Sequence, residues 1–108
     1  MELTKQKCEA CEGGIPPFTL EEIKQYLPQL KLDWQVLANQ KLERIFKFKN
    51  FVEAVVFVNQ VAALAEAEGH HPNIYFTWGK CNIELWTHAV NGLSENDFIL
   101  AAKIDLIK

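Results

Sequence analysis

The three histidines of this 108-residue chain, His70, His71 and His88, are the side chains best suited to chemistry by type and spacing. His70 and His71 fall in a turn between a predicted helix and a predicted strand, and His88 falls at the end of the returning strand. In an antiparallel hairpin the start of one strand lies beside the end of the other, so this pairing brings the three imidazoles together. Because imidazole titrates near neutral pH, we expect a site for moving protons rather than three isolated surface histidines.

Two carboxylates near these histidines have both functional and purely structural interpretations. Glu66 lies four residues before His70, where it either orients an imidazole or is simply an exposed residue in the last turns of a helix. Asp97 lies three residues after Ser94, and this capping-box spacing explains it without any catalytic role. The residues alone leave the role of Glu66 open and place Asp97 at the start of a helix.

Three residues of the returning strand, Cys81, Trp86 and Thr87, give less specific signals. Trp86 alternates onto the same side as His88, so it either stacks on a flat ring or covers the sheet. Thr87 is interpreted as an ordinary strand residue. Cys81 alternates onto the inward side with apolar neighbours, which predicts a core thiol and not a catalytic nucleophile.

The spacing Cys8-x-x-Cys11 has two chemical interpretations besides free thiols. One is a zinc site completed by His70 and His71, but adjacent histidines on an extended chain point apart. The other is a thioredoxin-like redox pair, but no strand precedes it to build such a site. We therefore predict free thiols on a mobile N-terminal arm. An odd number of cysteines and the lack of an apolar signal-peptide core predict a reducing cytoplasm.

Composition and charge narrow the class of protein. The formal net charge is −3, with 49% hydrophobic and 23% charged residues, as in a compact single domain. The mild acidic excess argues against a nucleic-acid partner, and no apolar stretch is long enough to predict a membrane span. Charge is uneven, however, because residues 31–50 hold five bases and two acids, a net of +3. A solvated strand face explains this run best, and a basic surface for an anionic partner is the alternative.

Capping residues, prolines, glycines and hydrophobic periodicity predict an irregular arm over residues 1–18 and one domain over 19–108. The expected elements are a helix from Thr19 to Leu27 before Pro28, strands near 34–36 and 42–48 joined by a turn at 38–40, a helix between Asn50 and Gly69, a hairpin turning at Gly79-Lys80 and returning from Cys81 to His88, and a helix from Ser94 to about Ile107. This α-β-β-α-β-β-α order predicts an α+β fold, with a four-stranded antiparallel sheet and three helices packed on one face.

The helix expected over residues 51–65 carries one charge and is apolar almost all round. A surface helix needs only one apolar stripe. We therefore expect one face to pack on the sheet and the opposite face to pack on another subunit.

The spacing Glu66-x-x-x-His70-His71-Pro72, followed by Trp78, His88 and Asp97, resembles the motif of the pterin-4a-carbinolamine dehydratases. The resemblance covers about residues 19–106 and includes further matching segments, namely Leu42-Glu43-Arg44 to Phe48, Asn50-Phe51, Ala65 to Gly69, Trp78-Gly79-Lys80 and Gly92-Leu93-Ser94. The Cys-x-x-Cys arm is similar to that of bacterial members.

The resemblance implies the same α+β fold and dehydration of 4a-hydroxytetrahydropterin to quinonoid dihydropterin, with no metal or cofactor. By motif position, it implies that the three histidines perform acid–base catalysis and contact substrate, with Glu66 also at the substrate and Asp97 in support. Pro72 would shape their turn, and Trp86, Thr87, Ala89 and Val90 would hold the pterin edge largely by backbone. Val90 stands where some members have cysteine, and Asn73-Ile74 replace an acidic-aromatic pair of animal members, which bears on pterin side-chain preference.

The family also includes proteins that act by binding, among them a dimerisation cofactor for a transcription factor and assembly factors that lack the histidine set. All three histidines are present here, so an enzyme is favoured and an oligomeric binding protein is the alternative. The resemblance further implies a homodimer or homotetramer and a place beside an aromatic amino-acid hydroxylase pathway.

Overall fold

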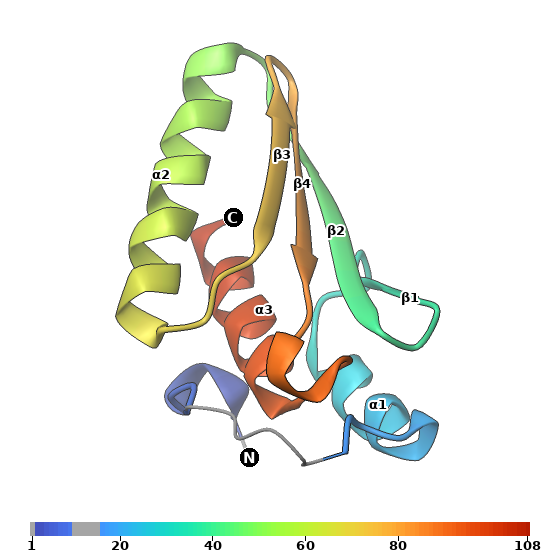
Figure 1. The fold of residues 1–108 in the computed structure, drawn as a ribbon. Coiled ribbons are helices and arrows are strands. Elements are labelled where there is room, and N and C mark those ends of the chain that lie inside the picture. Colours follow the sequence, from blue (N-terminus) through green and yellow to red (C-terminus); the bar gives the residue numbers. More distant parts are fainter. Residues whose placement is uncertain (1, 10–15) are drawn as a thin grey trace.

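The computed structural model describes residues 2–9 and 16–108 and has the predicted order of helices and strands (Figure 1). Its elements are η1 (Leu3–Lys5), α1 (Leu20–Tyr26), η2 (Leu27–Gln29), β1 (Gln35–Leu37), β2 (Lys41–Lys47), α2 (Phe51–Glu68), β3 (Asn73–Thr77), β4 (Lys80–Leu85), η3 (His88–Val90) and α3 (Glu95–Ile107), where η marks a 3₁₀ turn. The strands form one antiparallel sheet in the order β1-β2-β4-β3. The α+β prediction is therefore confirmed.

The helices α2 and α3 lie on the same side of the sheet, and α1 lies near the sheet's lower end in the view of Figure 1. The inner face of the sheet is apolar because alternate strand residues are buried, and the core between the sheet and these helices includes Leu42, Phe46, Ile83, Leu85, Phe57, Val61, Leu100 and Ile104. The ring of Phe98 on α3 packs against Phe18 and Tyr26, with ring centroids 5.8 and 5.4 Å away. In the described part of the chain, no helix combines the length and apolar character that crossing a membrane requires.

Local capping signals fix the ends of the helices where the sequence predicts them. Thr19 forms a capping box with Glu22 at the start of α1. The side chain of Asn50 accepts a hydrogen bond from the Glu53 N–H, 2.9 Å away, at the start of α2. Gly69 ends α2 with φ = 66°, a left-handed conformation that glycine adopts at little cost. These ends place His70 directly after α2, and a Ser94–Asp97 capping box starts α3.

The second hairpin differs from the prediction at both ends. Thr77 pairs with Lys80, so the turn consists of Trp78 and Gly79 rather than Gly79 and Lys80. The returning strand ends at Leu85 and not at His88. It ends early because Thr87 forms an isolated bridge with Gly92, which closes residues 88–91 into a loop that contains η3.

The N-terminal segment is more ordered than the predicted irregular arm. Residues 2–9 include η1, and Leu3 and Cys8 are 4% and 7% exposed. The Cys8 N–H donates to Glu68 Oε1 over 2.9 Å, which ties the segment to the end of α2. Burial, together with the nearby Glu68 carboxylate, raises the pKa of the Cys8 thiol to about 12. Cys8 is a free thiol, as predicted, but it is buried and held against α2 rather than placed on a mobile arm. Cys11 lies outside the described residues.

Replacing Glu68 with glutamine is expected to destabilise the protein more at neutral pH than in acid. Burial alone would raise the pKa of Glu68, but hydrogen bonds from Lys103 Nζ and from the Cys8 N–H outweigh burial, so the pKa is lowered. A carboxyl with a lowered folded-state pKa stabilises the protein above its unfolded-state pKa, and this contribution is lost as pH falls through the folded-state value. Urea unfolding should show a lower midpoint for Glu68→Gln at neutral pH and a smaller difference in acid. An equal difference at both would contradict this assignment.

Candidate active site

His70 is held in a fixed position by the chain reversal at the end of α2. Its backbone N–H donates to the Ala65 carbonyl over 3.2 Å, and the left-handed Gly69 turns the chain toward α3. The Nε2 atom of His70 then lies 2.6 Å from Oδ1 of Asp97. The His70 side chain is 12% exposed and the Asp97 side chain is fully buried. No residue of the described ranges forms a hydrogen bond with Nδ1 of His70.

Asp97 does more than begin α3, which is all that its sequence spacing predicts. Its Oδ2 accepts hydrogen bonds from Thr87 Oγ1 and from the Ser94 N–H, each 2.9 Å away, while Oδ1 faces His70. A buried carboxylate is costly unless hydrogen bonds compensate it, and three partners do so here. An ionised carboxylate only accepts hydrogen bonds, so Asp97 favours a His70 ring that carries a proton on Nε2.

Thr87 is part of this network and not the ordinary strand residue expected from alternation. It is 4% exposed, and its hydroxyl contacts both Asp97 Oδ2 and Ser94 Oγ, the latter 2.7 Å away. The Thr87 N–H donates to the Gly92 carbonyl over 2.8 Å. A side chain at Gly92 would bring its Cβ to 2.7 Å from Pro17 Cβ, so this close packing requires glycine.

His71 has a carboxylate partner, but it is not the arrangement expected from spacing. The Nε2 atom of His71 lies 2.5 Å from Oε2 of Glu66. The four-residue spacing predicts a contact between Glu66 and His70. In the structure, the chain turns at Gly69 so that His70 contacts Asp97, and Glu66 contacts His71 instead. Both side chains are exposed, at 61% for His71 and 78% for Glu66, so this pair is far more open to solvent than the His70–Asp97 pair.

His88 lies in η3, exposed, with its ring centroid 4.5 Å from that of Trp86 at an interplanar angle of 45°. The ammonium of Lys41, at the start of β2, lies over the Trp86 ring, 4.3 Å from its centroid. Lys41 was missed by sequence reasoning because only the β2–β4 register brings it beside Trp86. That register pairs Leu42 with Leu85. Because the strands are antiparallel, Lys41, before Leu42, lies opposite Trp86, which follows Leu85.

The structure brings the predicted residues to one end of the hairpin but gives each histidine a different partner. Asn73 pairs with Glu84, so the chain before β3 runs beside the chain after β4, and Asp97 joins His70 to Thr87 there. His71 pairs with Glu66, and His88 contacts Trp86. The remaining predicted substrate-contacting residues occupy the same region: Pro72 is half-buried before β3, Ala89 is exposed and Val90 is buried in η3.

This arrangement supplies one largely buried, fixed imidazole and two exposed ones, which suits proton donation and acceptance at neighbouring atoms. Over residues 2–9 and 16–108, no group of three or more His, Cys, Asp or Glu side chains is placed to hold a metal ion. The zinc interpretation required Cys11, which lies outside those ranges.

Comparison with known proteins gives relatives over nearly the whole chain. Provisionally named pterin-4-alpha-carbinolamine dehydratases of Rickettsia canadensis and Methylococcus capsulatus are 53% and 51% identical over 103 and 104 residues. Each alignment covers 95% of this chain, and it covers 94% of the Rickettsia protein and 90% of the Methylococcus protein.

Solved structures with this fold have been described in two functional contexts. A transcriptional coactivator/pterin dehydratase from Brucella melitensis superposes with a TM-score of 0.78 at 34% identity, over 84% of this chain and 97% of that one. A pterin dehydratase-like protein described as a RuBisCO assembly factor in the alpha-carboxysome gives a TM-score of 0.62 at 28% identity, over 71% and 90%. The family model for pterin 4 alpha carbinolamine dehydratase matches residues 16–107, and this chain belongs to that family.

Proposed function

We propose that the protein catalyses the dehydration of 4a-hydroxytetrahydropterin to quinonoid dihydropterin, a step in recycling a tetrahydropterin cofactor in the cytoplasm. In this reaction the C4a–O bond breaks and the oxygen leaves as water after gaining a proton. N5 loses its proton and a C4a–N5 double bond forms. One group must therefore donate a proton while another accepts one. The observation that carries the proposal is the contact between His70 and the fully buried carboxylate of Asp97, which fixes one imidazole at the end of the hairpin where the other two histidines also lie in the sequence.

The three histidines have environments that suit different parts of this reaction. His70 is fixed by Asp97, so it is suited to contact the reacting atoms directly. His71, next to Glu66, and His88, next to Trp86, are exposed and can exchange protons with solvent after each turnover. The half-buried ring of Trp86 lies at the rim of this site, with the ammonium of Lys41 over it and the ring of His88 beside it. The proposed proton transfers use these side chains and no metal.

A turnover assay tests this function against the binding alternative. The carbinolamine also dehydrates unaided, so the rate with protein must be compared with the uncatalysed rate under the same conditions. We expect formation of quinonoid dihydropterin well above that background. A protein that oligomerises but gives no rate above background would instead support a binding or assembly role, the context in which one structural neighbour is described.

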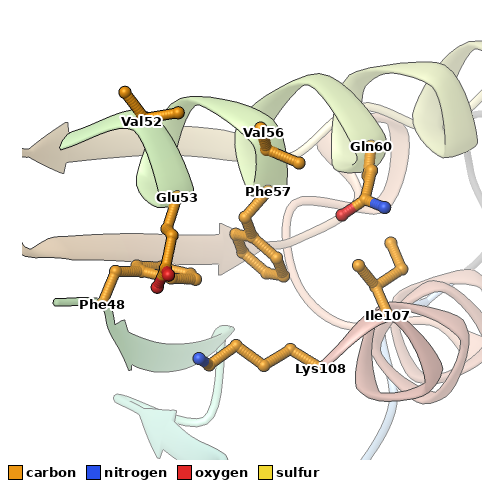
Figure 2. A pocket seen from close by; sticks show the side chains of 8 residues that line it. All are labelled: Phe48, Val52, Glu53, Val56, Phe57, Gln60, Ile107 and Lys108. Atoms are coloured by element: carbon orange, nitrogen blue, oxygen red, sulfur yellow. The ribbon is translucent and has the colours of Figure 1, made fainter. Parts of the chain in front are cut away.

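Self-association is proposed through the outer face of α2. Its inner face is buried at Ala54, Phe57, Val61 and Ala65, yet Phe51, Val52 and Val56 are 53%, 70% and 51% exposed. A groove of about 330 Å³ continues this apolar surface between α2, Phe48 and the end of α3 (Figure 2). Exposed apolar surface of this kind is typical of contacts between subunits.

Replacing Val56 with glutamate is expected to shift the protein from an oligomer to a monomer, because the charge would be buried without a partner at the contact. Light scattering at micromolar concentration measures the change. Leu32→Glu is the matched control, since Leu32 is 99% exposed and lies away from α2. A monomeric parent protein, or equal behaviour of both variants, would contradict this assignment.

A further inference from the structure

The basic run over residues 31–50 is largely used inside the fold. Lys31 and Arg44 both contact Asp105, and Lys41 lies over the ring of Trp86. The charged groups of these three residues therefore already have partners within the protein, and they do not form a free basic surface.

Lys49 pairs with Glu53, so Lys47 is the exception in this run, and a second lysine from another strand lies opposite it. Lys47 at the end of β2 is paired directly with Lys80 at the start of β4. Both side chains are exposed, and neither forms an ion pair with any residue in 2–9 or 16–108. Like charges directly opposite each other on neighbouring strands destabilise a sheet, so an anion between these two ammonium groups would relieve a repulsion that the folded chain retains.

A cavity and an exposed aromatic ring lie beside this lysine pair. The cavity has a volume of about 300 Å³ and is lined by Lys47, Phe48, Thr77, Trp78, Gly79 and Lys80. Trp78 is 66% exposed in the hairpin turn, where its ring can stack on a flat ligand. The turn is held by the Phe48 N–H, which donates to the Gly79 carbonyl over 2.8 Å, so the lining does not depend on a free loop.

We propose that this cavity, bounded by Lys47, Lys80 and Trp78, binds a small planar anion of the nucleoside monophosphate class. The base would stack on Trp78 and the phosphate would lie between the two ammonium groups. The volume fits one such ligand, and the net charge of −3 argues against a polynucleotide. The cavity is at the turn of the β3–β4 hairpin. His70 and His71 precede β3 and His88 follows β4, at the open end of the hairpin, so the two sites are separate.

Titration of the intact protein with adenosine monophosphate, followed by NMR, tests the proposal. We expect saturable shifts at the Trp78 indole N–H and the Gly79 and Lys80 amides, with the buried Trp34 indole unchanged. Lys80→Gln and Trp78→Leu should each weaken binding about tenfold, as expected for loss of a charged contact or a stacked ring. Lys24→Gln on α1 is the matched control and should bind as the parent does. Circular dichroism should show that each variant folds, and Lys80→Gln should melt no lower than the parent because it removes the lysine repulsion.

Three results would overturn the proposal. The first is no saturable shift at the hairpin turn with adenosine monophosphate at millimolar concentration. The second is shifts around His70 and Trp86 that disappear in His71→Ala, which would place the bicyclic base in the histidine site. The third is affinity that rises steadily with oligonucleotide length and falls steeply with salt, which would indicate a polynucleotide surface. Adenosine and inorganic phosphate, titrated separately, should each bind more weakly than the combined ligand.

Discussion

Replacing His70 with alanine is expected to lower kcat for the dehydration by about 10²–10⁴-fold, the range of a positioned acid–base group. His70 is the histidine whose orientation is fixed from within the protein, through the 2.6 Å contact with Asp97. The loss should therefore fall mainly on kcat, because substrate binding would retain the other residues of the site. The measurement is the initial rate corrected for uncatalysed dehydration, with folding checked by circular dichroism. An unchanged kcat in a folded His70→Ala protein would contradict the catalytic assignment.

Asp97 acts through His70 in this proposal, so its variant needs a control for helix capping. Asp97→Asn keeps the shape but weakens the contact that sets the His70 tautomer. Its effect should not add to that of His70→Ala, because residues that act as a unit lose most of their joint function at the first removal. Ser94→Ala is the control for capping, since it weakens the start of α3 by about 1 kcal/mol and removes the contact of the Ser94 hydroxyl with Thr87, but keeps both partners of the Asp97–His70 contact. A purely structural role predicts similar kinetic losses for Ser94→Ala and Asp97→Asn.

The pH dependence of the rate distinguishes these roles further. Imidazoles in general titrate near neutral pH, so a histidine that transfers a proton gives the kcat profile a limb there. That limb should change in shape in His70→Ala and in Asp97→Asn but not in Ser94→Ala. A binding protein without activity would show no limb because it has no rate above background.

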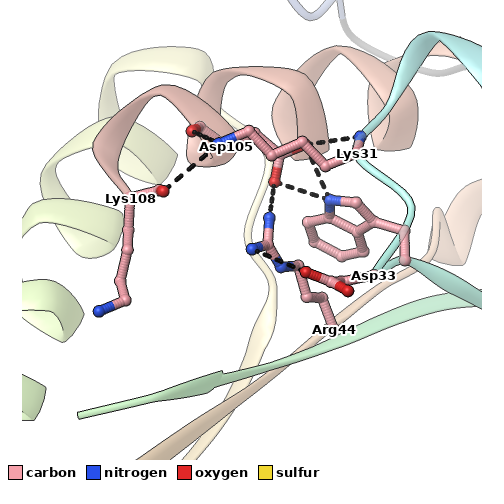
Figure 3. Close-up of polar contacts among 6 residues, drawn as sticks. Lys31, Asp33, Arg44, Asp105 and Lys108 are labelled. Carbon is pink, nitrogen blue, oxygen red and sulfur yellow. Dashed lines mark hydrogen bonds and ion pairs between the residues drawn. The ribbon is translucent and has the colours of Figure 1, made fainter. Parts of the chain in front are cut away.

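The largest expected loss of stability follows from breaking the buried ion pair between Arg44 and Asp105 (Figure 3). Their side chains are 10% and 7% exposed, and Asp105 also accepts a hydrogen bond from Trp34 Nε1 over 2.8 Å. Replacing Arg44 with methionine would leave the Asp105 charge buried without its ionic partner. We expect the free energy of unfolding to fall by about 3–5 kcal/mol, as measured for removal of one member of a buried pair.

Two matched variants make this prediction specific to the pair. Asp33 also contacts Arg44, over 3.3 Å, but its side chain is 73% exposed, so Asp33→Ala should cost less than about 1 kcal/mol. Arg44→Met combined with Asp105→Leu removes both charges and should be more stable than Arg44→Met alone. Urea unfolding of all four proteins gives the values. Equal losses for Arg44→Met and Asp33→Ala would contradict the assigned importance of burial.

Helix ends, which depend on residues close in sequence, were predictable from the sequence. The end of β4, which depends on contacts between distant parts of the chain, was not. Thr19, Asn50 and Gly69 mark helix ends through local hydrogen bonds and backbone conformation, so their spacing was sufficient. The end of β4 depends on Gly92, whose bridge to Thr87 is packed against Pro17, and nothing near Leu85 in the sequence signals it.

The same distinction applies to the candidate site. The convergence of His70 with the end of the hairpin was predictable from antiparallel pairing. The choice of Asp97 as the partner of His70, and of Glu66 as the partner of His71, depends on the direction in which Gly69 turns the chain. Lys41 belongs to a different hairpin and reaches Trp86 only through the β2–β4 pairing. Spacing along the chain carries no information about either arrangement.

One carboxylate both starts α3 and holds His70, so the orientation of the proposed catalytic imidazole depends on the first turn of this helix. Helix ends open and close with smaller free energies than whole domains, and each opening of the first turn of α3 would release the Asp97 contacts with Thr87 and Ser94. The imidazole would lose its fixed orientation at the same moment, although the sheet and the rest of the core stay intact. In the proposed mechanism, opening of this turn would abolish activity at temperatures below the melting point, and exchange of the Asp97 amide, which donates to the Ser94 carbonyl, would measure how often the turn opens.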